Sequence, residues 1–307
     1  MYKTFHEIIA RAKEGKCTRI CVAAAEDGEI LKALEETGKM GLTKGILVGR
    51  KEKIKELLEE NQLSESFEII DAVSDEKAVE KAVVLTRSER ADVLMKGLVN
   101  SSIFMKKVLD KENGLRTDRI ISHMACYEIP GYEKLLFCTD SGINVAPNLE
   151  RKIAILKNAL GALSKMGYQQ PKVALLAANE MVDPKVAATR DAADIMGIYQ
   201  NGVFENCIME GPLAFDVIFS AEAAKHKGIK CEISGQVDLL LCPSIEVGNA
   251  LGKSWLHFNN ARWAGLVLGG TKPILMGSRS DTFEVKVNGI ALACLMNSLT
   301  GEYKSIE

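Results

Sequence analysis

Short apolar runs alternate with amphipathic segments along almost the whole chain. Apolar runs of about four to eight residues are typical of buried strands, and apolar positions that recur every three or four residues are typical of helices. Their alternation predicts an α/β fold with mostly parallel sheets. Strands are predicted over 19–25, 45–48, 67–70, 92–95, 120–126, 135–139, 172–177, 238–242, 265–268 and 273–276. Helices are predicted over 28–37, 51–60, 76–86, 101–109, 149–166, 184–196, 214–225, 246–258 and 283–295.

The length of 307 residues allows one large or two medium domains. The strands at 120–126 and 135–139 have no helix between them, which predicts a hairpin around Pro130-Gly131. The long helix that follows Ala146-Pro147-Asn148 is a natural crossover between domains. We therefore expect a first α/β domain of residues 1–147 plus 273–307 and a second α/β domain of residues 148–272.

Composition indicates a globular protein with a sizeable core, since 47% of the residues are hydrophobic and 26% are charged. A net charge of -2 implies no general attraction to nucleic acid or to a membrane surface. No apolar signal region opens the chain, and no apolar run approaches the ~20 residues that span a bilayer. The eight cysteines form no Cys-x-x-Cys pair and several lie in apolar runs, so we interpret them as reduced core thiols of a cytoplasmic protein.

The segment 272–284 carries the most informative chemistry. A predicted strand ends at Gly277, and a hydroxyl, a guanidinium and a carboxylate then precede the predicted helix from Phe283: these are Ser278, Arg279 and Asp281. Free N–H groups at a helix N-terminus favour anions, and the guanidinium matches phosphate oxygens. Asp281 is a candidate base in a phosphoryl or acyl phosphate site. The alternative is an aspartate that caps the helix beside a surface arginine.

Polar groups also follow the strand that ends near Met95. Gly97 allows the backbone to approach a ligand, and Lys96 adds positive charge. Ser101 and Ser102 either bind phosphate or cap the helix that begins there. The alternative is an ordinary glycine turn with a serine cap.

Two further strand-to-helix junctions carry polar side chains, and such carboxyl-end crevices host ligands in α/β sheets. The first holds Asp140 and Asn144, which could equally satisfy only the loop backbone. The second holds Asp183 and Lys185, where a cap followed by a proline is the structural alternative. We interpret 210–216 as another turn into a helix.

Several common sites are disfavoured. Gly248 and Gly252 precede Lys253-Ser254 but have three residues between them, where a phosphate-binding Walker loop needs four. No Gly-x-Gly-x-x-Gly occurs, and the four histidines have no metal-binding spacing.

Taken together, the junctions resemble the phosphate acetyl/butyryl transferase, or phosphotransacylase, family, and within it the butyryl branch. The similarity runs in order from about residue 90 to 298. The matching stretches are Lys96-Gly97 with Ser101-Ser102, Asp140 to Pro147, Asp183-Pro184-Lys185 with Thr189 and Asp191-Ala192, Gly211 to Asp216, Asp238 to Lys253, and Ser278-Arg279-Ser280-Asp281.

The resemblance implies a two-domain fold of the isocitrate/isopropylmalate dehydrogenase type, with the active site in the cleft between domains. It implies a reaction of a short-chain acyl-CoA with phosphate to give an acyl phosphate and CoA. CoA is then a substrate, no cofactor is tightly bound, no metal is required, and the protein is a homo-oligomer, a dimer or larger. No nucleic-acid or membrane partner is expected.

Carried over to this sequence, Arg279 binds the phosphoryl group and Ser278 stabilises the developing charge. Ser101 and Ser102 line the phosphate pocket, while Lys96, Gly97, Asp140, Asn144, Asp183 and Lys185 contact phosphate or CoA. Which carboxylate acts as the base is left open: Asp281 is the first choice and Glu284 the second. The butyryl branch usually has His-Thr where this chain has Asn100-Ser101, so one contact there differs.

Three alternatives stay open: a phosphate acetyltransferase, a metal-dependent hydroxyacid dehydrogenase of the same fold, and a non-catalytic sensor of acyl-CoA. The dehydrogenase would need a set of aspartate ligands and a nucleotide loop, and the sequence has no compact aspartate cluster. The sensor would keep the pocket and lose the base.

Overall fold

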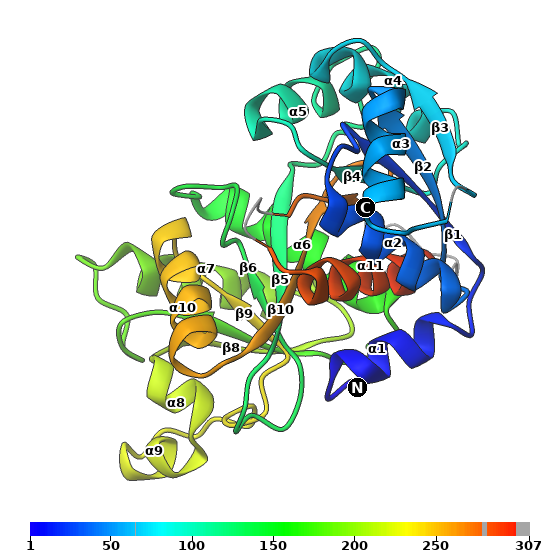
Figure 1. The fold of residues 1–307 in the computed structure, drawn as a ribbon. Coiled ribbons are helices and arrows are strands. Elements are labelled where there is room, and N and C mark those ends of the chain that lie inside the picture. The colour runs from blue at the N-terminus through cyan, green and yellow to red at the C-terminus, as the bar shows by residue number, and fades with distance from the viewer. Residues whose placement is uncertain (65, 278–280, 299–307) are drawn as a thin grey trace. The chain divides into compact units, whose positions relative to one another are not determined.

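The computed structural model describes residues 1–64, 66–277 and 281–298, and its internal contacts divide the chain into two compact units (Figure 1). We call Met1–Thr4 with Ser122–Arg262 the inserted unit, and Phe5–Ile121 with the chain from Trp263 onward the flanking unit. This division lies at 121/122 and 262/263, whereas the sequence suggested boundaries at 147/148 and 272/273. The hairpin after residue 121 groups with the inserted unit because its second strand pairs with a strand of that unit.

The flanking unit is built on strands in the order β3-β2-β1-β4-β11-β10. The pairs among β3, β2, β1, β4 and β11 are parallel, and β10 pairs antiparallel with β11. The strands are β1 (Thr18–Ala23), β2 (Thr43–Gly49), β3 (Glu68–Asp71), β4 (Val93–Lys96), β10 (Arg262–Leu268) and β11 (Ile274–Leu275). The carboxyl ends of the parallel strands therefore share one edge of the sheet.

Helices of the flanking unit pack in two groups. Helix α11 packs against α1 and α2, and α4 packs against β1, β2 and α5. The helices are α1 (Phe5–Ala12), α2 (Gly28–Lys39), α3 (Lys51–Glu60), α4 (Asp75–Arg87), α5 (Ser101–Val108) and α11 (Phe283–Ser298). Residues 287 and 290–296 of α11 are buried, so this helix forms part of the core, as expected for a helix that is apolar all round.

Polar caps fix where several helices begin. The carboxylate of Asp27 accepts hydrogen bonds from the N–H groups of Glu29 (3.0 Å) and Ile30 (3.1 Å) at the start of α2. Asn148 caps the first helix of the inserted unit by accepting from the N–H of Arg151 (3.0 Å). Such caps satisfy donors that have no partner inside the helix.

The inserted unit has strands in the order β5-β6-β9-β7-β8, with an antiparallel β5–β6 pair and parallel pairs elsewhere. The predicted hairpin is confirmed, and Gly131 supplies the positive φ of +89° in its turn. The strands are β5 (Ser122–Glu128), β6 (Leu136–Thr139), β7 (Lys172–Leu176), β8 (Ile208–Leu213) and β9 (Leu239–Leu241). The helices are α6 (Leu149–Lys165), α7 (Ala187–Gln200), α8 (Phe215–Phe219), α9 (Ala221–His226) and α10 (Ile245–Phe258).

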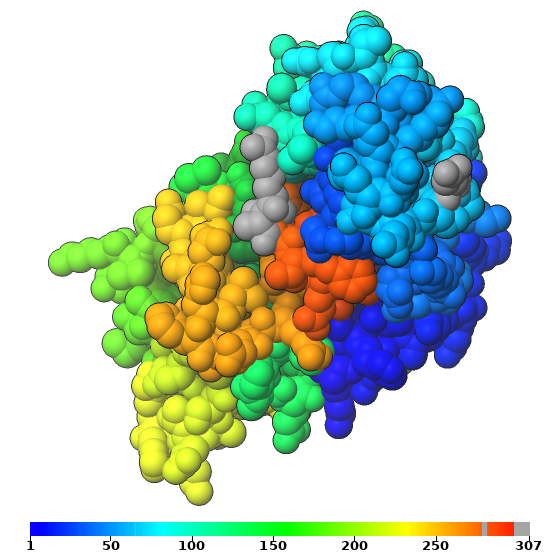
Figure 2. Space-filling model, in the orientation of Figure 1, coloured from blue at the N-terminus to red at the C-terminus, as the bar shows by residue number. Residues whose placement is uncertain are grey.

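The expected α/β class with mostly parallel strands is confirmed, but several elements differ from the prediction. Helix α1 was not predicted, and the residues around Gly211-Pro212 belong to strand β8 and not to a turn. Proline is tolerated there because β8 is the last strand in the order and, among the described residues, has β7 as its one neighbour. The helix predicted over 214–225 is divided at Ser220, whose hydroxyl caps α9. The two short helices form the yellow projection in Figure 2.

All eight cysteines are free thiols. Six of them are buried, in agreement with their interpretation as core residues, but Cys17 is exposed and Cys231 is partly exposed. Burial raises the pKa of the Cys21 thiol to about 12, so this thiol stays protonated at neutral pH. None of the helices in the described parts of the chain has the length and apolar character needed to cross a membrane.

Candidate active site

The flanking unit carries one group of predicted site residues at the carboxyl end of β4. Lys96 is the last residue of that strand and is buried. Its ammonium donates hydrogen bonds to the carbonyl oxygens of Val99 (3.0 Å) and Gly97 (3.3 Å). The lysine therefore holds the turn that leads from β4 into α5, and its positive charge lies at the sheet edge where ligands bind in this class of fold.

Gly97 packs directly against the main chain at the end of β1. A Cβ atom added here would overlap the main-chain oxygens of Ala23 and Ala24. Since these are backbone atoms and cannot move aside as a flexible side chain would, only glycine fits. The neighbour that requires glycine here is the protein's own backbone, and the approach of Gly97 to a ligand stays a prediction.

The first turn of α5 presents two exposed serines. The helix is capped by Asn100, whose side-chain oxygen accepts from the N–H (2.9 Å) and the hydroxyl (2.8 Å) of Ser102. The cap is therefore the asparagine and not a serine. Ser101 lies at the helix N-terminus, where backbone N–H groups and the helix dipole favour an anion.

Ser278 and Arg279, two of the predicted catalytic residues, lie outside the described residues. Asp281 is partly buried, and its carboxylate packs so closely on Gly277 that an added Cβ there would lie 2.9 Å from Oδ2. The main-chain oxygen of Asp281 accepts a hydrogen bond from the buried ammonium of Lys286 (2.6 Å). Glu284, the alternative base, is exposed in the first turn of α11.

The inserted unit carries the second group, and Asp140 lies at its centre directly after β6. Its carboxylate accepts four hydrogen bonds of 2.7 to 2.9 Å. The donors are the main-chain N–H groups of His123, Gly142 and Ile143 and the side-chain amide of Asn144. A buried carboxylate with this many donors is well satisfied, so Asp140 shapes the loop that follows β6.

His123 was not among the predicted site residues, although it lies beside this loop. One ring nitrogen is 3.1 Å from the hydroxyl of Ser141. Burial lowers the pKa of His123, and the nearby Asp140 carboxylate opposes that effect only in part. The imidazole is therefore neutral at pH 7, and one of its nitrogens can accept a proton or a hydrogen bond.

A series of side-chain hydrogen bonds links the Asp140 loop to helix α6. The amide of Asn144 donates to Asp140 (2.7 Å), and the amide oxygen of Asn144 accepts from the guanidinium of Arg151 (3.1 Å). Arg151 was missed in the sequence. The signal was present, because two cations follow each other in the first turn of α6, where a helix normally favours acidic residues.

The Asp183–Lys185 loop lies between β7 and α7. The carboxylate of Asp183 accepts from the N–H of Lys185 (2.8 Å), and the N–H of Asp183 donates to the hydroxyl of Thr189 (3.0 Å). These contacts form a compact turn, so α7 begins at Ala187 and not at Pro184 as predicted. The side chain of Lys185 is exposed.

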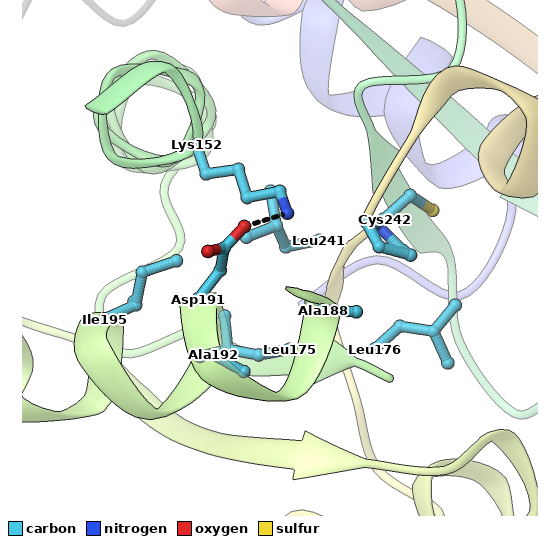
Figure 3. A pocket seen from close by; sticks show the side chains of 10 residues that line it. Lys152, Leu175, Leu176, Ala188, Asp191, Ala192, Ile195, Leu241 and Cys242 are labelled. Carbon is cyan, nitrogen blue, oxygen red and sulfur yellow. Dashed lines mark hydrogen bonds and ion pairs between the residues drawn. The ribbon is translucent and has the colours of Figure 1, made fainter. Parts of the chain in front are cut away.

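A partly buried ion pair lies next to this loop and was not predicted as a pair. The ammonium of Lys152 on α6 is 2.6 Å from a carboxylate oxygen of Asp191 on α7 (Figure 3). Around it is a small, mostly apolar cavity lined by Leu175, Leu176, Ala188, Ala192, Ile195, Leu241, Cys242 and Pro243.

The predicted residues thus fall into two groups, each at the carboxyl end of the parallel strands of its own unit. Lys96, Gly97, Ser101, Ser102 and Asp281 belong to the flanking unit, and Asp140, Asn144, Asp183 and Lys185 belong to the inserted unit. Within the described part of the chain, no three or more histidine, cysteine, aspartate or glutamate side chains come together in a way that could hold a metal ion.

The chain matches the family described as "Phosphate acetyl/butaryl transferase" over residues 67–294. It is 38% identical to the phosphate butyryltransferase of Clostridium acetobutylicum over 297 residues, which cover 96% of this chain and 99% of that protein. It is 36% identical to the phosphate acetyltransferase of Rhizobium meliloti, covering 95% of this chain and 92% of that protein. The chain therefore belongs to this family of phosphate acyltransferases.

The fold comparison agrees with the family. The crystal structure of a branched-chain phosphotransacylase from Enterococcus faecalis V583 superimposes with a TM-score of 0.82 at 29% identity. The match covers 91% of this chain and 99% of that protein. The resemblance stated from the sequence is confirmed.

Proposed function

We propose that this protein interconverts a short-chain acyl-CoA and phosphate with an acyl phosphate and CoA, and that its acyl group is butyryl or a chain of similar size. The observation that carries the proposal is the similarity to a phosphate butyryltransferase along 96% of the chain. A phosphate acetyltransferase is the second candidate, because relatives of that name cover almost as much of the chain at 36% identity.

The reaction replaces the C–S bond at the acyl carbon with a C–O bond, or the reverse. In one direction a phosphate oxygen attacks the thioester carbonyl, the C–O bond forms, the C–S bond breaks and CoA leaves as a thiolate. In the other direction the CoA thiol loses its proton to a base and attacks the acyl carbon, and phosphate leaves. The thiolate is the nucleophile, so a carboxylate that accepts the thiol proton accelerates this direction.

The residues of the flanking unit suit the phosphate side of this reaction. Ser101 and Ser102 offer hydroxyls and N–H groups at the start of α5, and the cation of Lys96 lies at the end of the preceding strand. Arg279 would bind the phosphoryl group with two N–H donors, and Ser278 would stabilise the charge that develops. Asp281 is the proposed base, with Glu284 as the alternative.

The polar loops of the inserted unit suit the CoA side. Asp183 and Lys185 belong to an exposed turn, and the loop that Asp140 and Asn144 organise lies at the same edge of the same parallel sheet. We propose that these loops contact the CoA ester, that no cofactor is tightly bound, and that the protein acts in the cytoplasm as a homo-oligomer.

Purified protein should convert butyryl-CoA and phosphate to butyryl phosphate and free CoA without added metal. The expectation follows from the family and from residues that offer anion contacts and a carboxylate base. Thiol release from butyryl-CoA on addition of phosphate, followed with a thiol reagent, measures it. Complete loss of thiol release in EDTA, or no release from any acyl-CoA of two to six carbons, would contradict the proposal.

The ratio of kcat/KM for butyryl-CoA over acetyl-CoA should exceed one. Each methylene placed in an apolar pocket is worth about 1–3 kcal/mol, so two extra methylenes allow a strong preference without full exclusion of acetyl-CoA. Initial rates with both esters at fixed phosphate give the ratio. A ratio below one would assign the protein to the acetyl branch and leave the phosphate contacts unaffected.

A further inference from the structure

The ion pair between Lys152 and Asp191 is costly to bury. The exposed fractions of the two side chains are 6% and 21%, and the groups around them are mostly aliphatic. Removing charges from water has a cost that the attraction between them often does no more than offset. Replacement of such pairs by apolar side chains is often neutral or stabilising, so the pair is weak evidence for a role in stability alone.

The cavity beside the pair is too small to explain it as a ligand site. Its volume is about 10 Å³, which is the space of one water molecule and far below that of an acyl chain. The ammonium of Lys152 is engaged by the carboxylate of Asp191. What the pair does instead is join two helices, because Lys152 lies in the first turn of α6 and Asp191 in the second turn of α7 (Figure 3).

Each helix continues a loop with predicted substrate contacts. The residue before Lys152 is Arg151, which binds Asn144 and through it the Asp140 loop. Two residues before Asp191 is Thr189, whose hydroxyl holds the main chain of Asp183. The ion pair closes this series of contacts, so it connects the loop after β6 with the loop after β7.

We propose that Lys152 and Asp191 are a positioning pair that fixes the Asp183–Lys185 loop against the Asp140–Asn144 loop for binding of the CoA ester. The pair touches no substrate itself. The inference rests on the proposed function, since it assumes that these two loops contact the acyl-CoA. An ion pair near the starts of two helices fixes one position of the two loops relative to each other. Aliphatic contacts alone would define that position less sharply.

Asp191→Asn should raise KM for butyryl-CoA about tenfold and change kcat by less than about threefold, because the loops shift while the proposed phosphate contacts and base belong to the flanking unit. Lys152→Met/Asp191→Leu should unfold at a temperature equal to or above that of the wild type, yet keep the raised KM. The single variant Lys152→Arg should keep a KM near that of the wild type, because a guanidinium still pairs with the carboxylate of Asp191.

Glu68→Gln is the matched control. It removes one carboxylate from the exposed ion pair with Arg90 in the flanking unit with the same change in charge, and it should leave KM and kcat unchanged. A double variant that folds normally and has wild-type KM would overturn the proposal and leave the pair a structural feature.

Hydrogen exchange tests the same idea without catalysis. In Asp191→Asn, the main-chain amides of residues 178–190 should exchange faster than in the wild type, while those of β1 and β2 should not change. Unchanged exchange in that loop would also overturn the positioning role. An inactive wild-type protein would instead contradict the proposed function, so the two failures are distinguishable.

Discussion

Replacing Arg279 with alanine is expected to lower kcat by about 10²–10³-fold, which is the usual effect of removing one donor that stabilises transition-state charge. The phosphate that leaves, or attacks, carries its charge on oxygens that a guanidinium can bind with two parallel N–H groups. The residue lies in a polar sequence between Gly277 and Asp281, so the variant should fold normally. Steady-state phosphorolysis of butyryl-CoA and a thermal unfolding curve measure the two effects.

Arg279→Lys is the control for geometry. Lysine keeps the positive charge and loses the planar fork, so it should recover little of the lost turnover if the arginine binds phosphate through two contacts. Full recovery by lysine would mean that only charge is needed there. Kinetics of Arg279→Ala close to those of the wild type would remove this residue from the site.

The fold class was predictable because parallel strands that are buried on both faces appear in the sequence as short apolar runs between amphipathic helices. The strands around 19–25 and 45–48 and the helices that follow them are found close to where they were predicted. Strand β8 was not predicted, because a Gly-Pro pair usually indicates a turn. A strand would be expected there only if its position at the edge of the sheet were known. Edge position depends on tertiary structure, which local sequence does not specify.

The candidate site was predictable only as separate junctions. Local spacing identified Asp140 and Asp183 as loop residues after strands, and both do follow strands of one parallel sheet. The contact of Lys152 with Asp191 spans 39 residues in the sequence, and nothing in the spacing of two charged residues predicts such a pair. Likewise, the saturation of Asp140 by four donors becomes visible only once the loop is folded.

Asp281→Asn is expected to lower kcat for the transfer from butyryl phosphate to CoA by about 10²–10⁴-fold, the usual contribution of a positioned general base. The amide keeps the shape and the hydrogen-bonding reach of the side chain but accepts no proton. The structure supports the choice of this residue, since the carboxylate is partly buried and packs on Gly277, while its main chain is held by Lys286. KM for phosphate in the reverse reaction should change much less than kcat.

The pH profile separates loss of a base from simple damage. A carboxylate base loses its function when it is protonated, so the wild-type rate should fall on the acid side of the profile. In Asp281→Asn that acid limb should flatten, because the group that titrates there is gone. A variant with a lower rate and an unchanged acid limb would show that another group is the base.

Glu284→Gln distinguishes Asp281 from Glu284 as the catalytic base. Glu284 lies three residues later in the first turn of α11, where its exposed side chain can reach the same helix N-terminus. If Asp281 is the base, Glu284→Gln should keep kcat within about threefold of the wild type and retain the acid limb, since the group that accepts the thiol proton is still present. If Glu284→Gln is instead the variant with the large loss and the flattened limb, the base is Glu284 and the carboxylate mechanism stands.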